Sequence, residues 1–90
     1  KAGVIGLTRA LAQEVGPSGV TVNCVAPSMM ETNFLKDTPD LIVQAAAEEN
    51  PMGRNATPAD VVPAMVFLLS DEARFITGVT LPVTGGSAIV

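Results

Sequence analysis

Ninety residues allow at most one small domain, and a formal net charge of -4 disfavours nucleic acid or an anionic membrane as the main partner. The chain has no histidine and one cysteine, Cys24, so it cannot assemble a Ser-His-Asp triad, a common zinc site or an internal disulfide by itself. No apolar run reaches the roughly 18 residues of a membrane-spanning helix and no leader peptide is recognisable, which favours a soluble, cytoplasmic protein.

The first part of the chain predicts a helix followed by a buried strand. Ala2 to Val15 carries apolar residues at close to the i, i+3, i+4, i+7 spacing of an amphipathic helix, and the breaker cluster GPSG at residues 16–19 ends it. Val20 to Ala26 is short, β-branched and nearly uncharged, as a strand of a parallel sheet should be. Pro27 and Ser28 are expected to end this strand.

Two helix starts follow. Residues 37–40 (DTPD) predict the first, which leads into a short helix from Leu41 to Glu49 and a loop at residues 50–56. Residues 57–60 (TPAD) predict the second more strongly. Thr57 can cap the helix, Pro58 suits its first turn, and Asp60 can accept backbone N–H bonds at the positive end of the helix dipole.

The second of these helices is expected to run to about Ser70. Its predicted core face consists of four apolar residues: Val61, Met65, Leu68 and Leu69. Val79 to Val83 then predicts a second strand, and the glycine pair at residues 85–86 turns the chain into a short apolar tail.

The predicted order is helix, strand, helix, helix, strand. A strand joined to the next through helices indicates an α/β fold, namely part of a doubly wound parallel sheet with helices on its faces. Two strands alone are marginal in water, and 48% of the residues are apolar. We therefore expect residues 1–90 to be an incomplete piece of a single domain, with faces that other structure covers.

Five segments together resemble a known family. They are KAGVIGLTRALAQEV, GVTVNCVAPSMMET, NPMGR, PADVVPAMVFLLSDEARFITG and LPVTGG, in this order and at the family's spacing. The chain is similar over its whole length to the C-terminal portion of the short-chain dehydrogenases/reductases, and most similar to their 3-oxoacyl-acyl-carrier-protein reductases. This resemblance implies a Rossmann-like fold, an NADP or NAD cofactor, and interconversion of a carbonyl and an alcohol, with a 3-oxoacyl thioester of fatty acid biosynthesis as one candidate substrate.

Lys1 is the candidate catalytic residue by this resemblance. It matches the family's active-site lysine, which follows a tyrosine by four residues on one helix; that tyrosine would precede the present sequence. An ammonium beside a phenol lowers the pKa of the phenol, and it can also donate to the ribose hydroxyls of the cofactor. From the residues alone, Lys1 could equally be a solvated charge at a helix end.

The segment after the first strand is the candidate cofactor contact by the same resemblance. Pro27, Ser28, Met30 and Thr32 correspond to the family's Pro-Gly motif, whose backbone and threonine meet the nicotinamide side of the cofactor. Ligands of open α/β sheets bind at the carboxyl ends of strands, which agrees with this position. Ser28 replaces the usual glycine, and a positive φ there would strain a serine.

The remaining matches concern packing, subunit contacts and the substrate lid. Gly3 and Gly6 indicate close packing of the first helix, against either another subunit or the core of the same one. Arg54 is expected to form a structural ion pair, Cys24 to be a small core residue, and residues 33–50 to form a substrate lid. The family implies a homotetramer.

A non-catalytic, interaction-only or truncated family member remains an alternative to the enzyme. Without the tyrosine and the glycine-rich phosphate loop, residues 1–90 alone are expected to be inactive.

Overall fold

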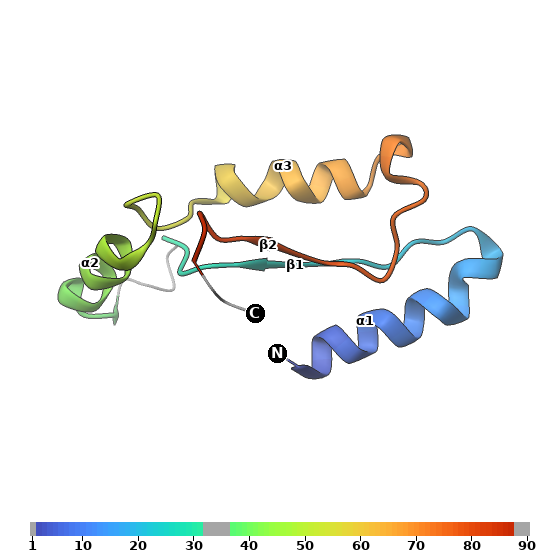
Figure 1. Cartoon of the computed structure of the whole chain (residues 1–90), viewed down its shortest axis with the longest axis horizontal. Coiled ribbons are helices and arrows are strands. Elements are labelled where there is room, and N and C mark those ends of the chain that lie inside the picture. The colour runs from blue at the N-terminus through green and yellow to red at the C-terminus, as the bar shows by residue number, and fades with distance from the viewer. Residues whose placement is uncertain (1, 32–36, 88–90) are drawn as a thin grey trace. The chain divides into compact units, whose positions relative to one another are not determined.

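A computed structural model describes residues 2–31 and 37–87 of the chain and shows an α/β arrangement (Figure 1). In chain order the elements are α1 (Ala2–Val15), the 3-10 turn η1 (Gly16–Ser18), β1 (Cys24–Pro27), α2 (Asp40–Glu49), α3 (Pro58–Leu68), the 3-10 turn η3 (Asp71–Ala73) and β2 (Thr80–Val83). The predicted order of helices and strands is therefore confirmed.

The two strands form a parallel pair. Cys24 N–H donates to the Val79 carbonyl at 2.9 Å, and four residues further along both strands Ser28 N–H donates to the Val83 carbonyl at 3.3 Å. Equal steps in the same direction along both strands are the signature of parallel pairing, which requires the long helical crossover seen between them. None of the described helices is long and apolar enough to cross a membrane.

The chain divides into two compact units, and the divisions fall within β1, α3 and β2. One unit comprises Lys1–Val25 with Ala64–Leu81, and the other comprises Ala26–Pro63 with Pro82–Val90. The residues proposed to contact the cofactor after β1 fall in the second unit.

In the first unit, α1 spans the predicted residues and buries one narrow face. Thr8 and Ala12 are buried on it, and the Thr8 hydroxyl donates to the Val4 carbonyl one turn earlier at 2.7 Å. Gly78 has φ +74°, and a Cβ placed there would lie 3.4 Å from the Ala12 Cβ. Glycine at this position therefore permits both a left-handed turn and close contact with α1.

The first strand is shorter at its start than predicted: it begins at Cys24, not at Val20. Over the preceding residues one backbone bond between the two segments remains, from Gly78 N–H to the Val22 carbonyl at 2.7 Å, and side chains supply the others. Asn23 Nδ2 donates to the Ile76 carbonyl and Asn23 Oδ1 accepts from Val79 N–H, both at 3.0 Å. Val22 N–H donates to the Thr77 hydroxyl, also at 3.0 Å. Side-chain bonds therefore satisfy part of the backbone where the regular ladder has not yet begun.

Two of the four residues predicted to form the core face of α3 are buried. Val61 and Leu68 are buried, whereas Met65 is 47% exposed and Leu69 is 86% exposed. The helix is apolar around most of its circumference, so hydrophobic periodicity alone does not select the stripe that this chain covers. The helix also ends at Leu68, ahead of Ser70, whose hydroxyl donates to the Phe67 carbonyl at 2.6 Å.

Candidate functional site

Lys1 and Thr32 lie outside the described residues, so their predicted roles stay predictions. Pro27 ends β1, and Ser28 and Met30 follow it directly. The three described candidates therefore lie together at the carboxyl end of a parallel strand, where open α/β sheets bind ligands.

A second backbone contact holds the segment after β1 in place. Met30 and Ala56 form a parallel bridge, in which Ala56 N–H donates to the Met29 carbonyl at 3.0 Å and Glu31 N–H donates to the Ala56 carbonyl at 2.8 Å. Ala56 is itself buried. The loop before α3 thus fixes the direction in which the chain leaves β1.

The anticipated strain at Ser28 does not occur. Among the described residues, every positive φ belongs to a glycine, so Ser28 adopts a backbone conformation open to any L-residue. Its hydroxyl oxygen is buried and has no hydrogen-bond partner among the described residues. Serine therefore fits the backbone here but introduces a polar atom that glycine lacks.

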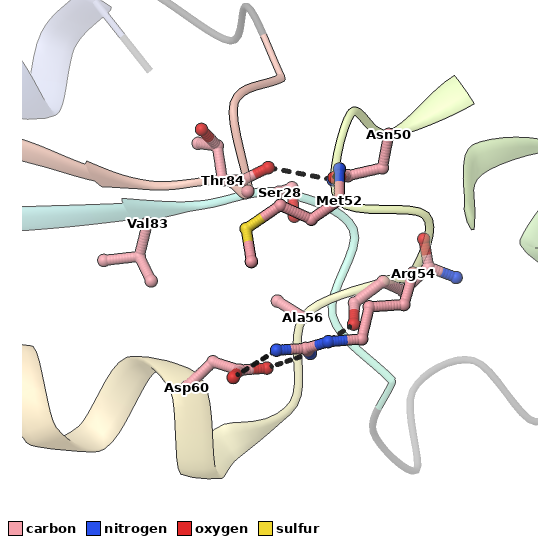
Figure 2. Close-up of a pocket in the computed structure, with 10 residues that line it drawn as sticks. Ser28, Asn50, Met52, Arg54, Ala56, Asp60, Val83 and Thr84 are labelled. Atoms are coloured by element: carbon pink, nitrogen blue, oxygen red, sulfur yellow. Dashed lines mark hydrogen bonds and ion pairs between the residues drawn. The ribbon is translucent and has the colours of Figure 1, made fainter. Parts of the chain in front are cut away.

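Ser28 lines a cavity of about 180 Å³ within the second unit (Figure 2). The end of β2 and the loop and helix that follow α2 complete its wall. Its lining residues are Ser28, Asn50, Met52, Arg54, Asn55, Ala56, Asp60, Val83, Thr84 and Gly85. Both polar and apolar residues line it, as in pockets that fix a polar group by a few hydrogen bonds.

Asn50 joins the loop after α2 to the end of β2. It is buried, its Nδ2 donates to the Thr84 carbonyl at 2.8 Å, and its Oδ1 accepts from Met52 N–H at 2.9 Å (Figure 2). Gly85 has φ +62°, and a Cβ there would lie 2.6 Å from Asn50 Oδ1. The close approach of this asparagine and the positive φ therefore favour glycine at position 85.

Arg54 and Asp60 form the ion pair that the sequence predicted. Arg54 Nη1 donates to Asp60 Oδ2 at 2.6 Å and Arg54 Nη2 donates to Asp60 Oδ1 at 2.9 Å, so the pair is bidentate. Asp60 Oδ2 also accepts from the backbone N–H of Thr57 at 2.8 Å and from its hydroxyl at 3.0 Å. The carboxylate thereby caps the start of α3, which confirms its predicted role.

These bonds shift the pKa values of both side chains and favour their charged forms. The hydrogen bond from Arg54 is the largest cause that holds the pKa of the Asp60 carboxyl well below its usual range, and the two bonds from Thr57 lower it further. The same pair raises the pKa of Arg54. Arg54 thus serves the structure of the loop that supports the segment after β1.

Sequence reasoning missed the asparagines that organise both units, of which two are buried in the second unit. Asn50 and Asn55 are 7% and 4% exposed, and Asn55 Nδ2 donates to the Val43 carbonyl at 2.9 Å. Asn23 has the same function beside β1. Asparagines next to proline, arginine or strand residues look like ordinary loop or strand positions, and their partners are distant in sequence, so no local signal identifies them.

Residues 1–88 match the family model described as enoyl-(acyl carrier protein) reductase. A solved short-chain dehydrogenase/reductase from Brucella melitensis superposes with a TM-score of 0.87 at 31% identity, covering 96% of this chain and 35% of that one. This chain belongs to the short-chain dehydrogenase/reductase family. Its helices and strands form part of the Rossmann-like fold of that family.

Curated members of the family are more similar still. A 3-oxoacyl-[acyl-carrier-protein] reductase, FabG, from Vibrio harveyi is 48% identical over 90 residues. The (2S)-[(R)-hydroxy(phenyl)methyl]succinyl-CoA dehydrogenase subunit BbsD from Thauera aromatica is 42% identical over 89 residues. The chain covers 37% of the first and 36% of the second, so it spans little more than a third of these short-chain dehydrogenases/reductases.

The residues after β1 fit the nicotinamide cofactor expected of a short-chain dehydrogenase/reductase. They follow a parallel strand, the Met30–Ala56 bridge holds them, and no side chain in the segment is charged before Glu31. An uncharged segment with a fixed backbone suits the neutral carboxamide of a nicotinamide, which needs positioned hydrogen-bonding groups and no counter-charge.

Proposed function

We propose that the complete protein is an NAD(P)-dependent oxidoreductase that interconverts a carbonyl and an alcohol on an acyl thioester. The observation that carries this proposal is the segment Pro27–Met30, which continues β1 at its carboxyl end and is held there by Ala56. The names of the two curated relatives support the substrate class, because each specifies an acyl group carried by acyl carrier protein or by CoA.

In this proposal residues 27–32 orient the nicotinamide end of the cofactor. The backbone around Met30 contacts the carboxamide, and the Thr32 hydroxyl donates to the carboxamide or to a phosphate oxygen. Pro27 restricts the backbone at the end of β1, and Ser28 N–H is engaged by the Val83 carbonyl at 3.3 Å. The cofactor, when bound, supplies the hydride.

Lys1 supports proton transfer in the same proposal. Its ammonium lies one helical turn from a phenol on the preceding part of the chain, stabilises the phenolate and donates to the ribose of the cofactor. The phenol gives a proton to the carbonyl oxygen of the substrate as that oxygen becomes an alcohol. We further propose a cytoplasmic homotetramer, residues 33–50 as the substrate lid, and residues 1–90 as the C-terminal part of one domain.

Cofactor binding and turnover by the complete gene product test this function together. Titration with NADPH and with NADH, followed by nucleotide fluorescence, should show saturable binding of at least one of them. Oxidation of the bound nucleotide should then depend on an added acetoacetyl thioester. Saturable binding without turnover on any 3-oxoacyl thioester would refute the substrate class, whereas absence of nucleotide binding would favour the interaction-only alternative.

A further inference from the structure

The hydrogen bonds between Ala56 and the segment after β1 leave the backbone of Met30 free. Ala56 N–H donates to the Met29 carbonyl at 3.0 Å and Glu31 N–H donates to the Ala56 carbonyl at 2.8 Å, so both bonds of this parallel bridge use the neighbours of Met30. In parallel pairing the residue between two such bonds directs its own N–H and carbonyl to the opposite edge. The backbone of Met30 therefore presents one donor and one acceptor on the side away from Ala56.

A nicotinamide carboxamide has the complementary groups. Its carbonyl oxygen accepts hydrogen bonds and its amino group donates them, as in the side chains of asparagine and glutamine. The N–H and the carbonyl of Met30 can thus pair with both groups of the carboxamide, provided that the segment keeps its direction. That direction depends on the position of Ala56.

Asp60 holds the loop on both sides of Ala56. Two residues before Ala56, Arg54 donates two bonds to the carboxylate, at 2.6 and 2.9 Å (Figure 2). One residue after it, Thr57 donates from its N–H at 2.8 Å and from its hydroxyl at 3.0 Å. One carboxylate in the first turn of α3 therefore closes the short loop that carries Ala56.

The other anchor of this loop is Asn55. It is 4% exposed, and its Nδ2 donates to the Val43 carbonyl of α2 at 2.9 Å. Ala56 is thus fixed between an anchor on α2 and an anchor on α3. The bonds of Asp60 span no more than six positions of the chain, so we expect their loss to loosen the loop locally while longer-range contacts keep the chain folded.

We propose that Asp60 is a positioning residue for the nicotinamide end of the cofactor. By holding Arg54 and Thr57 it fixes Ala56, and Ala56 in turn directs the N–H and the carbonyl of Met30 toward the carboxamide. Asp60 acts through the loop and contacts neither cofactor nor substrate. The role rests on the proposed function of the complete protein as an NAD(P)-dependent oxidoreductase.

Calorimetric titration of the complete protein with two ligands tests this role. Asp60→Ala should raise the Kd for the preferred nucleotide, NADPH or NADH, by about three- to tenfold, the scale of one hydrogen bond. ADP-ribose, or its 2′-phosphate if NADPH is preferred, is the same nucleotide without the nicotinamide, and its Kd should be unchanged. A variant that loses affinity for both ligands, or for neither, would overturn the proposal.

Two further variants separate positioning from a general loss of stability. Gly78 lies in the first unit with φ +74°, and a Cβ there would lie 3.4 Å from that of Ala12, so Gly78→Ala adds backbone strain outside the loop at residues 54–57. This variant should lower Tm and leave both Kd values unchanged; a weaker nicotinamide affinity like that of Asp60→Ala would contradict the proposal. If Asp60→Ala does not fold, Asp60→Asn replaces it, because the amide oxygen can still accept from Thr57. Its Kd for the reduced nucleotide should rise by a smaller factor, and an unchanged Kd would again overturn the role.

Hydrogen exchange measures the loop without any cofactor. Peptides that contain the amides of Glu31 and Ala56 should exchange faster in Asp60→Ala than in the wild type, because both amides donate to the bridge that Asp60 stabilises. Unchanged exchange would show that the bridge does not depend on Asp60 and would overturn the proposal. A wild-type protein that binds neither NADPH nor NADH would instead refute the proposed function, and with it the role of Asp60 in cofactor binding.

Discussion

The guanidinium of Arg54 and the carboxylate of Asp60 meet through two parallel hydrogen bonds, of 2.6 and 2.9 Å, across the first turn of α3. Asp60 also accepts two bonds from Thr57, so one carboxylate closes the helix start and anchors the preceding loop. Ala56, a buried residue of this loop, supports the segment after β1.

We expect the contribution of Asp60 to stability to disappear in acid. Its pKa is depressed in the folded state, so as pH falls below the unfolded value of about 3.9 the unfolded chain binds the proton first and folding loses stability. Asp60→Asn should therefore lower the urea midpoint of the complete protein at pH 7, and the gap between wild type and variant should narrow towards pH 3. A gap that stays constant over this range would show that the charge of Asp60 contributes nothing. Asp71→Asn, at an exposed residue of η3, is the matched control.

Gly85→Ala should destabilise the protein more than Gly53→Ala. Both glycines have a positive φ, of 62° and 77°, so both changes add backbone strain of about 1 kcal/mol or more. At Gly85 the new Cβ would also lie 2.6 Å from Asn50 Oδ1, whereas at Gly53 it meets nothing within 4 Å. Urea unfolding of the two variants should differ by at least about 1 kcal/mol. Equal losses would mean that the contact with Asn50 relaxes without cost.

Lys1→Met in the complete protein should leave the fold intact and lower kcat/KM by at least about a hundredfold, the scale of lost acid/base support. Arg9→Met removes a positive charge from an exposed position of α1 and serves as the control. Circular dichroism checks the fold and steady-state kinetics the rate. A Lys1→Met variant that keeps more than half of the activity would identify Lys1 as a solvated charge.

Residues 1–90 produced alone should not reduce a carbonyl. The sequence has no tyrosine and no histidine to supply the proton. Incubation with NADPH or NADH and an acetoacetyl thioester should show nucleotide oxidation at the background rate, with the complete protein as the positive control. Turnover by the 90-residue chain would contradict the assignment of the proton donor to a tyrosine outside it.

The complete protein should be a homo-oligomer, and the 90-residue chain should aggregate or lack cooperative unfolding. Large apolar side chains are exposed on both α1 and α3, including Leu7 at 59% and Val66 at 59%, and Phe75 is 99% exposed. A Cβ at Gly3 or Gly6 would meet nothing within 4 Å among the described residues, so close packing of these glycines requires another partner. Light scattering and thermal melts measure both claims. A monomeric complete protein would contradict the first, and a monomeric, cooperatively melting 90-residue chain would contradict the second.

The sequence by itself determined the elements whose signals are local. The period of apolar residues defined α1 at Ala2–Val15, and Thr57, Pro58 and Asp60 marked the start of α3, because helix faces and caps depend on neighbours within a few residues. The five family segments also sufficed to identify the family. For the candidate site they placed Pro27, Ser28 and Met30 at the end of a strand; in the structure Pro27 ends β1, and Ser28 and Met30 come after it.

Only the tertiary structure showed the features that depend on residues far apart in the sequence. Just before β1, the Asn23 side chain forms hydrogen bonds with Ile76 and Val79, more than fifty positions away. Asn50 fixes the Gly85 turn from 35 positions away, and α3, apolar on most sides, buries Val61 and Leu68 while Met65 and Leu69 stay exposed. Local sequence determines whether a segment can form a helix or a strand. Which of its faces is covered, and which polar atom finds a partner, is determined by contacts that exist only once the chain has folded.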